Sequence, residues 1–159
     1  MGYTTEFSGQ INIEPPLNEQ EIEFLNKFAN TRRMHRKQGP YFVDGEGFAG
    51  QDCDEGVIEY NTPPAGQPSL WVQWIPTEGG IALEWDGGEK FYCATEWMAY
   101  IIDHFLKPNC IAKSSLPFLQ ANHVCNGVIK AQGEDMDDRW ELIVTDNKVT
   151  TVADRKSVV

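Results

Sequence analysis

The chain has few basic residues. Its 159 residues include 13 lysines and arginines against 24 aspartates and glutamates, which gives a formal net charge of −11 at pH 7. An acidic surface repels nucleic-acid phosphates and anionic lipid headgroups at long range, so we expect binding neither to duplex DNA nor to a membrane. A protein partner with a basic surface is attracted instead.

Long apolar runs are also missing. A transmembrane helix needs about 20 consecutive apolar residues, and no apolar stretch in this sequence approaches that length. The opening residues MGYTTEFSGQ lack the basic and apolar succession of a secretory signal, and Glu6 stands where N-myristoylation favours Ser or Thr. We therefore expect a cytoplasmic protein.

Clustered cysteines and catalytic motifs are absent as well. The cysteines are scattered without a CxxC pair, so we expect reduced, mostly buried thiols. A zinc site would have to be assembled from His104, Cys110, His123 and Cys125, of which only the last two are close in sequence. No nucleophile elbow, phosphate-binding loop, dinucleotide fingerprint or HExxH motif occurs. We predict no catalytic residue, metal or cofactor.

The composition is that of one globular domain. Hydrophobic residues make up 41% of the chain and charged residues 23%, so residues 1–159 are predicted to form a single domain with its own core. Residues 38–69 are rich in Gly, Pro and Asp and show no sustained period. We expect a long irregular excursion here, packed against the body through its aromatic residues Tyr41, Phe42, Phe48 and Tyr60.

Regular patterns predict the first strand and helix. Apolar residues alternate from Thr5 to Ile13, which indicates a strand over 3–14 that ends at two prolines. Asn18 precedes Glu21 by three residues, the spacing of a capping box, and predicts a helix over 19–35.

The stretch 70–106 holds four of the five tryptophans and predicts a hairpin followed by a helix. The strand over 70–75 is apolar on both faces, which is typical of a central strand, and pairs with a strand over 81–85. Asp86 to Glu89 is the predicted cap of the second helix. The buried stripe of that helix is Phe91, Ala94, Met98, Ile101, Ile102 and Phe105.

Strands over 123–132 and 139–145 and a small edge strand over 148–152 follow. The resulting order, βαββαβ with an extra C-terminal strand, is the ferredoxin-like split βαβ order. We predict an α+β protein with an antiparallel sheet and two helices on one face.

Charge and aromatic residues mark candidate binding positions. Segment 27–37 has five basic residues and no acid. These charges either complement the negative C-terminal end of the first helix dipole or form an anion-binding edge. Segment 38–106 has twelve acids and one lysine. Two tryptophans fall opposite the apolar stripes, where aromatic residues favour binding surfaces. The candidate binding residues are Arg32, Arg33, Arg36, Asp52, Asp54, Glu55, Trp71 and Trp97.

Acid–base or metal-assisted chemistry would have to use the carboxylates of the second helix. Glu89, Glu96 and Asp103 repeat every seven residues away from the apolar stripe, which is typical of a solvated helix face. A small metal-assisted hydrolase is therefore the weakest of our functional hypotheses.

Several sequence words resemble a family of small uncharacterised proteins from phages, prophages and bacteria. They are GYTTEFSG at 2–9, FANTRRMHR at 28–36, YNTPPAGQPSLWVQWIPTEGG at 60–80, EWDGGEKFY at 84–92, and NG at 126–127 with GEDMDDRW at 133–140. The resemblance spans nearly the whole chain, with departures in 38–53 and 109–122. It implies an accessory protein of a mobile element that works in the host cytoplasm, and it implies no particular chemistry.

Two binding hypotheses stand beside the hydrolase. The first is a non-enzymatic protein that inhibits a host defence or nucleic-acid-processing complex by docking a basic partner surface. The second is a ferredoxin-like module that binds a small nucleotide or RNA through the basic segment and aromatic residues of the sheet.

Overall fold

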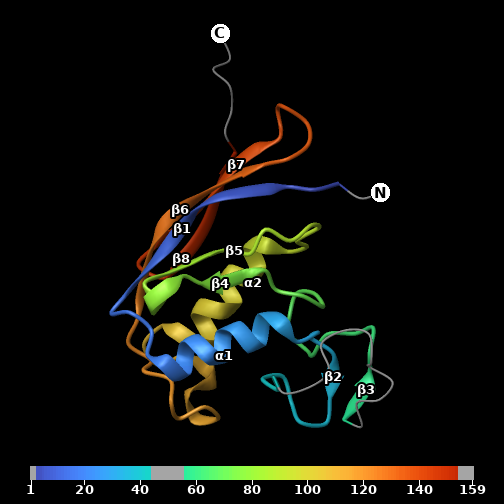
Figure 1. Cartoon of the computed structure of the whole chain (residues 1–159), viewed down its shortest axis with the longest axis vertical. Helices are drawn as coiled ribbons and strands as arrows, with labels where there is room; N and C mark the ends of the chain where they lie inside the picture. Colours follow the sequence, from blue (N-terminus) through green and yellow to red (C-terminus); the bar gives the residue numbers. More distant parts are fainter. Residues whose placement is uncertain (1–2, 44–55, 154–159) are drawn as a thin grey trace.

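A computed structural model describes residues 3–43 and 56–153 (Figure 1). Its elements are β1 (Glu6–Glu14), α1 (Glu19–Asn30), β2 (His35–Arg36), β3 (Val57–Glu59), β4 (Trp74–Pro76), η2 (Glu78–Gly80), β5 (Ala82–Trp85), α2 (Ala94–Ile101), the π-helical turn η3 (Ile102–Leu106), η4 (Ile111–Ser114), β6 (Val124–Gln132), β7 (Arg139–Thr145) and β8 (Lys148–Ala153). No helix in these two ranges is long and apolar enough to cross a membrane.

Six strands form one antiparallel sheet in the order β4-β5-β1-β6-β7-β8, and β2 pairs with β3 in a separate ribbon. β1 pairs along its whole length with β6, from Glu6 opposite Gln132 to Glu14 opposite Val124. On its other side β1 pairs with β5, where Ile11 lies opposite Leu83. The predicted α+β class, with an antiparallel sheet and two helices, is confirmed.

The sheet has one buried face and one open face. Phe7, Ile11 and Ile13 of β1 are buried, whereas the residues between them are exposed. The buried side chains join those of α1 and α2 in one hydrophobic cluster, and the helices lie together beside the sheet in Figure 1. The opposite face is left to solvent.

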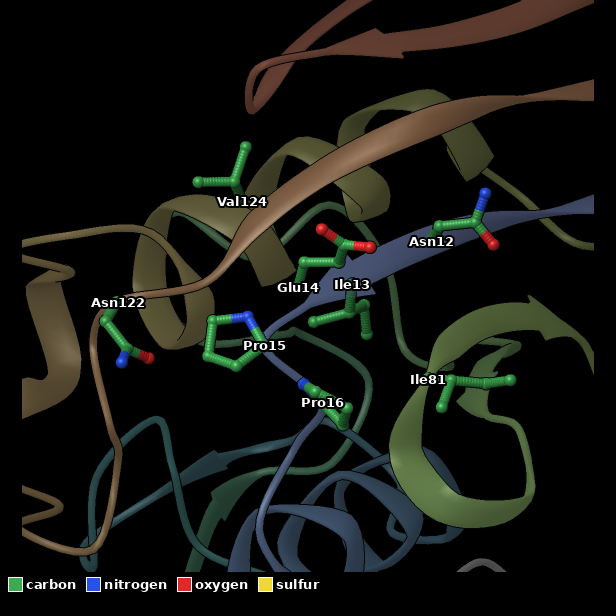
Figure 2. A pocket seen from close by; sticks show the side chains of 8 residues that line it. All are labelled: Asn12, Ile13, Glu14, Pro15, Pro16, Ile81, Asn122 and Val124. Atoms are coloured by element: carbon green, nitrogen blue, oxygen red, sulfur yellow. The ribbon is translucent and has the colours of Figure 1, made fainter.

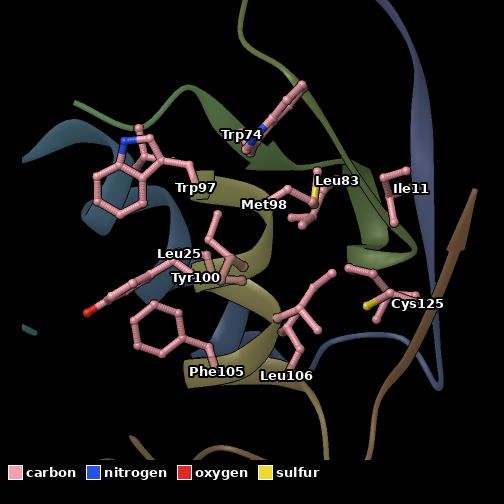
Figure 3. Packing of buried hydrophobic residues seen from close by; sticks show 14 of the residues in the cluster. Ile11, Leu25, Trp74, Leu83, Trp97, Met98, Tyr100, Phe105, Leu106 and Cys125 are labelled. Atoms are coloured by element: carbon pink, nitrogen blue, oxygen red, sulfur yellow. The ribbon is translucent and has the colours of Figure 1, made fainter. Parts of the chain in front are cut away.

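Aromatic rings fill the space between the helices and the sheet (Figure 3). Phe28 of α1 makes edge-on contacts with Trp97 and Phe105, at centroid distances of 5.9 and 5.1 Å. Phe7 of β1 makes edge-on contacts with four more rings, those of Trp74, Trp85, Phe91 and Trp140. Such pairs add about 0.5–1.5 kcal/mol each beyond the burial of area.

Helix α1 begins as predicted and ends earlier. The capping box is present: the Asn18 carboxamide accepts the Glu21 N–H at 2.7 Å, and the Glu21 carboxylate accepts the Asn18 N–H at 2.9 Å. The predicted end at His35 is wrong, because Thr31 takes an extended conformation and the Arg33 N–H binds the Leu70 carbonyl instead of continuing the helix. The basic residues 32–37 therefore lie beyond the helix.

The predicted central strand over 70–75 is also wrong. Only Trp74–Pro76 pairs as β4, and β4 is an edge strand whose neighbour beyond the sheet is α1. Asp86 does not cap a helix, since its carboxylate accepts the Gly88 N–H at 2.8 Å within a turn. α2 begins only at Ala94, after Cys93 in a left-handed conformation.

Gly9 allows β1 and β6 to approach each other. Its φ is +104°, and a Cβ at this position would lie 2.7 Å from the Val128 carbonyl oxygen. We expect Gly9→Ala to lower the free energy of unfolding by more than about 1 kcal/mol, because both the backbone conformation and the space oppose a side chain. Urea unfolding measures the change. Ser8→Ala, at the exposed neighbour, is the control, and equal stability of the two variants would contradict this account.

Candidate functional site

Two distinctive words of the sequence, 60–80 and 84–92, meet at a surface groove. The groove has a volume of about 410 Å³. It is lined by Pro63, Pro68, Ser69, Leu70, Trp71, Gln73, Glu89, Lys90 and Tyr92. We call it the Trp71 groove.

Two polar side chains hold the walls of the Trp71 groove together. The Ser69 hydroxyl accepts the indole N–H of Trp97 at 2.7 Å and lies 3.2 Å from the Trp71 carbonyl oxygen. The Gln73 carboxamide donates to the Glu89 carbonyl at 2.9 Å and accepts the indole N–H of Trp85 at 3.0 Å. These bonds fix both walls before any ligand arrives, which lowers the entropy cost of binding.

Trp71 differs from the other tryptophans of the chain. Trp74, Trp85 and Trp97 each donate an indole hydrogen bond, and the Trp140 ring packs against Phe7. Within the described residues, the half-buried Trp71 side chain has neither a hydrogen bond nor a ring contact. The indole N–H of Trp71 therefore has no partner in the part of the chain that the structure describes.

Tyr92 lies on the opposite wall and is 63% exposed. Its hydroxyl has no protein partner among the described residues. The groove thus presents two aromatic rings with two unused donors, the Trp71 N–H and the Tyr92 O–H. Tyr and Trp are the residues that most often anchor protein interfaces.

The chain segment that contains most of the groove is acidic, although the groove itself is lined by one acid, Glu89, and one base, Lys90. Residues 57–106 contain seven acids and a single base, Lys90. The acids of this segment are Glu59, Glu78, Glu84, Asp86, Glu89, Glu96 and Asp103. Glu89 and Lys90 are both exposed and both line the groove.

Trp97 does not belong to a binding surface. Its side chain is 0% exposed and lies in the core between Phe28 and Tyr100. The sequence interpretation of Trp97 as an exposed aromatic is therefore wrong. α2 is covered on this side by α1 and by the segment around Ser69, and the apolar stripe of α2 alone does not reveal that cover.

The three arginines do not form an anion-binding edge. Arg33 is 2% exposed and donates to the carbonyls of Thr31, Pro40 and Phe42, with its guanidinium 4.1 Å from the centre of the Phe28 ring. Burial lowers the pKa of Arg33 to about 9. The predicted anion site is therefore not supported at this residue.

The other two arginines also contact the protein itself. Arg36 is buried and lies 4.9 Å from the centre of the Phe42 ring. Arg32, at the surface, donates to the Tyr60 carbonyl and to the Asn61 side chain. These contacts join the segment after α1 to the residues around β3 and explain the basic cluster as structural.

The open face of the sheet offers no stacking platform. The residues that alternate with Phe7, Ile11 and Ile13 on β1 are polar. Their partners across the described strands include Val128, Ile143 and Lys130, and no aromatic residue. The aromatic residues of the sheet face the helices, so the hypothesis of base stacking on the sheet is not supported.

Figure 2 shows a larger hollow of about 700 Å³ at the ends of β1 and β6. Asn12, Glu14, Asn122 and Val124 line it together with prolines and Ile81, and Ile13 is its one buried lining residue. Its other lining residues are exposed, so the hollow is an open surface without a polar group held in place for chemistry.

The two histidines that a zinc site would have to use are engaged separately. His104 lies 2.7 Å from the Tyr41 hydroxyl and stacks on Tyr100, and burial lowers its pKa below the ordinary value. His123 bonds to Glu21 and to the Pro15 carbonyl. In the two described ranges no three His, Cys, Asp or Glu side chains are placed to hold a metal ion.

The carboxylates proposed for hydrolysis are spread over the surface. Asp103 pairs with Lys107 at 3.2 Å, and Glu89 and Glu96 are exposed. Asp52, Asp54 and Glu55 lie outside the described residues, so their binding role stays a prediction.

Comparisons with protein-family models, curated proteins and solved structures found no match.

Sequence reasoning found Trp71 but missed its neighbours. Ser69, Gln73 and Tyr92 complete the groove, and none of them stands out by residue type. A signal was nevertheless present, because the words 60–80 and 84–92 flank a hairpin. Residues before the first strand and after the second strand of a hairpin lie side by side.

Proposed function

We propose that this protein is a small acidic binding module that docks a basic segment of a partner protein in the Trp71 groove. The observation that carries the proposal is the unused indole of Trp71 in a groove whose walls are already fixed by Ser69 and Gln73. A rigid aromatic anchor in a preformed groove favours tight binding at a low entropy cost.

The acidic surroundings support the choice of a basic partner. Seven acids and one base in residues 57–106 attract a cationic segment and speed its encounter with the groove. The resemblance to phage and prophage proteins supports a further proposal about context. The partner belongs to a host defence or nucleic-acid-processing complex, which this protein inhibits in the host cytoplasm.

We also propose a ferredoxin-like framework for the fold. In the order β4-β5-β1-β6, the strand β5 lies between β4 and β1 and is antiparallel to both. A split βαβ unit has this arrangement, with one strand between two parallel ones. β7 and β8 extend the sheet beyond β6.

Trp71→Ala tests the proposed function. Peptides of about 12 random residues, displayed and selected on the wild-type protein, are expected to be enriched in Lys and Arg. Loss of the indole is expected to weaken binding of the selected peptides by at least about tenfold, the effect of removing an interface anchor. Isothermal titration calorimetry measures the dissociation constants.

Met136→Ala is the matched control, because Met136 is 78% exposed in the β6–β7 turn and does not line the groove. It is expected to bind the selected peptides like the wild type. Failure to select any peptide, or selection of peptides that bind Trp71→Ala equally well, would contradict the proposed function.

A further inference from the structure

Several backbone carbonyls of the Trp71 groove are already engaged in hydrogen bonds. The Leu70 carbonyl accepts from the Arg33 N–H, and the Gln73 carbonyl accepts from the Asp86 N–H. The Glu89 carbonyl accepts from the Gln73 side chain. A ligand that binds as an added β-strand places its own N–H groups on free backbone carbonyls, and these three carbonyls of the groove are already occupied.

The neighbouring edge of the sheet is not suited to the addition of a strand either. β4 is the strand nearest the groove in sequence, and its outer side faces α1. Pro76 in β4 has no N–H to offer. Strand addition is therefore disfavoured at this end of the sheet.

The unused polar groups of the groove fit a ligand backbone that is rich in hydrogen-bond acceptors and poor in donors. Its unused groups are three side-chain donors, the Trp71 N–H, the Tyr92 O–H and the Lys90 ammonium. One charged acceptor, the Glu89 carboxylate, lies beside them. The best complement has free carbonyl acceptors, few N–H donors and a positive charge. A proline-rich segment in the polyproline II conformation meets the first two requirements, because proline has no N–H and the helix has no internal hydrogen bonds.

The apolar lining fits the same ligand. Pro63, Pro68, Trp71 and Tyr92 give the groove an apolar surface between its polar groups. Proline rings pack against aromatic side chains in the known grooves for such segments, and the preformed helix loses little entropy on binding. The acidic surroundings add the requirement for a cationic residue.

We propose that the Trp71 groove recognises a proline-rich segment in the polyproline II conformation that carries an arginine or lysine directed toward Glu89. This inference rests on the proposed function and specifies its ligand. The indole N–H of Trp71 and the hydroxyl of Tyr92 donate to carbonyl oxygens of the segment, while its prolines pack between the two rings.

Three synthetic peptides of about 12 residues test the ligand class. The first combines prolines with arginines, the second replaces the prolines by alanine at equal charge, and the third replaces the arginines by glutamine. Calorimetry is expected to show that the first peptide binds at least about tenfold more tightly than either of the others. An equally tight alanine peptide would overturn the polyproline assignment, and an equally tight glutamine peptide would overturn the role of charge.

Three substitutions test the contacts. Trp71→Phe keeps an aromatic ring and removes the N–H donor, so it is expected to weaken the first peptide by about three- to tenfold, the effect of one hydrogen bond. Glu89→Lys is expected to weaken the same peptide, and Lys90→Glu to strengthen it, with both effects reduced by salt. Unchanged affinity in Trp71→Phe would overturn the proposed indole contact.

The two proposals fail in different ways. If random peptides are selected in a Trp71-dependent manner while none of the three synthetic peptides binds, the proline-rich ligand is overturned and the binding function stands. If neither the random nor the synthetic peptides bind, both proposals are overturned.

Discussion

Replacement of Trp97 by alanine is expected to lower the free energy of unfolding by about 3–5 kcal/mol, the usual cost of removing a large aromatic side chain from a core. The Trp97 ring is fully buried and makes edge-on contacts with Phe28 and Tyr100, at centroid distances of 5.9 and 5.3 Å. Its indole N–H binds the Ser69 hydroxyl. Urea unfolding followed by circular dichroism measures the loss.

Trp71→Ala is the matched control, because the same side chain is deleted from a half-buried position where it has no hydrogen bond and no ring contact in the described structure. We expect its melting temperature to remain within a few degrees of the wild type. If both variants lose similar stability, the assignment of one tryptophan to the core and the other to binding is contradicted.

The bond between Trp97 and Ser69 also connects the core to the Trp71 groove. Ser69 forms part of the groove wall and lies 3.4 Å from the Tyr92 carbonyl oxygen. The indole N–H of the fully buried Trp97 holds the Ser69 hydroxyl in place. This part of the groove wall is therefore fixed by the packing of the core. Binding sites are more precise when packing locks the side chains that support them.

The strands could be predicted from the sequence where the chain alternates between a buried and a solvated face. β1, β6 and β7 show this alternation because one side of the sheet is open. The capping box could be predicted because Asn18 and Glu21 are close in sequence. Local signals were sufficient in both cases.

The errors arose where distant contacts override local pattern. Segment 70–73 has the sequence pattern of a strand. Its Leu70 carbonyl, however, accepts a hydrogen bond from the backbone N–H of Arg33, which follows the C-terminal end of α1. The basic tail continues the helical composition, yet Arg33 leaves the helix to reach the carbonyls of Pro40 and Phe42. Neither partner is detectable from a periodic pattern.

The candidate site shows the same limit. Trp71 and Trp97 both lie opposite an apolar stripe, so the sequence ranks them equally. Only the packing separates them, because α1 and Ser69 cover Trp97, while the half-buried ring of Trp71 has no hydrogen bond and no ring contact in the described structure. Residue type and spacing predict which face of a helix or strand a side chain lies on. Whether other elements cover that face depends on the topology of the fold.

A buried hydrogen-bonded pair joins the first turn of α1 to the residue before β6. Glu21 and His123 are both 0% exposed, and the His123 Nε2 lies 3.1 and 3.0 Å from the two Glu21 carboxylate oxygens. The His123 Nδ1 lies 2.6 Å from the Pro15 carbonyl oxygen. Both ring nitrogens of His123 therefore lie within hydrogen-bond distance of oxygen atoms, one on each side of the ring.

Glu21→Gln is expected to lower the free energy of unfolding by about 3 kcal/mol at pH 7, because the fully buried carboxylate accepts hydrogen bonds from His123, Asn18 and Gln120 that a neutral carboxamide cannot all replace. The same carboxylate accepts the backbone N–H groups of Asn18 and Gln120, so the substitution also weakens the cap of α1. Chemical unfolding measures the change. Glu23→Gln, which breaks an exposed pair with Lys27 on the same helix, is expected to cost less than about 1 kcal/mol.

The effect of Glu21→Gln must also depend on pH. Burial raises the pKa of Glu21, but the hydrogen bonds from His123, Asn18 and Gln120 outweigh it, and the pKa lies below the ordinary value of 4.5. A lowered pKa in the folded state means that the carboxylate stabilises the protein above pH 4.5, and that this stabilisation is lost as the pH falls through the folded-state pKa. Wild type and Glu21→Gln should therefore converge in stability in acid, whereas a constant difference from pH 7 to pH 3 would show that the charge of Glu21 contributes nothing.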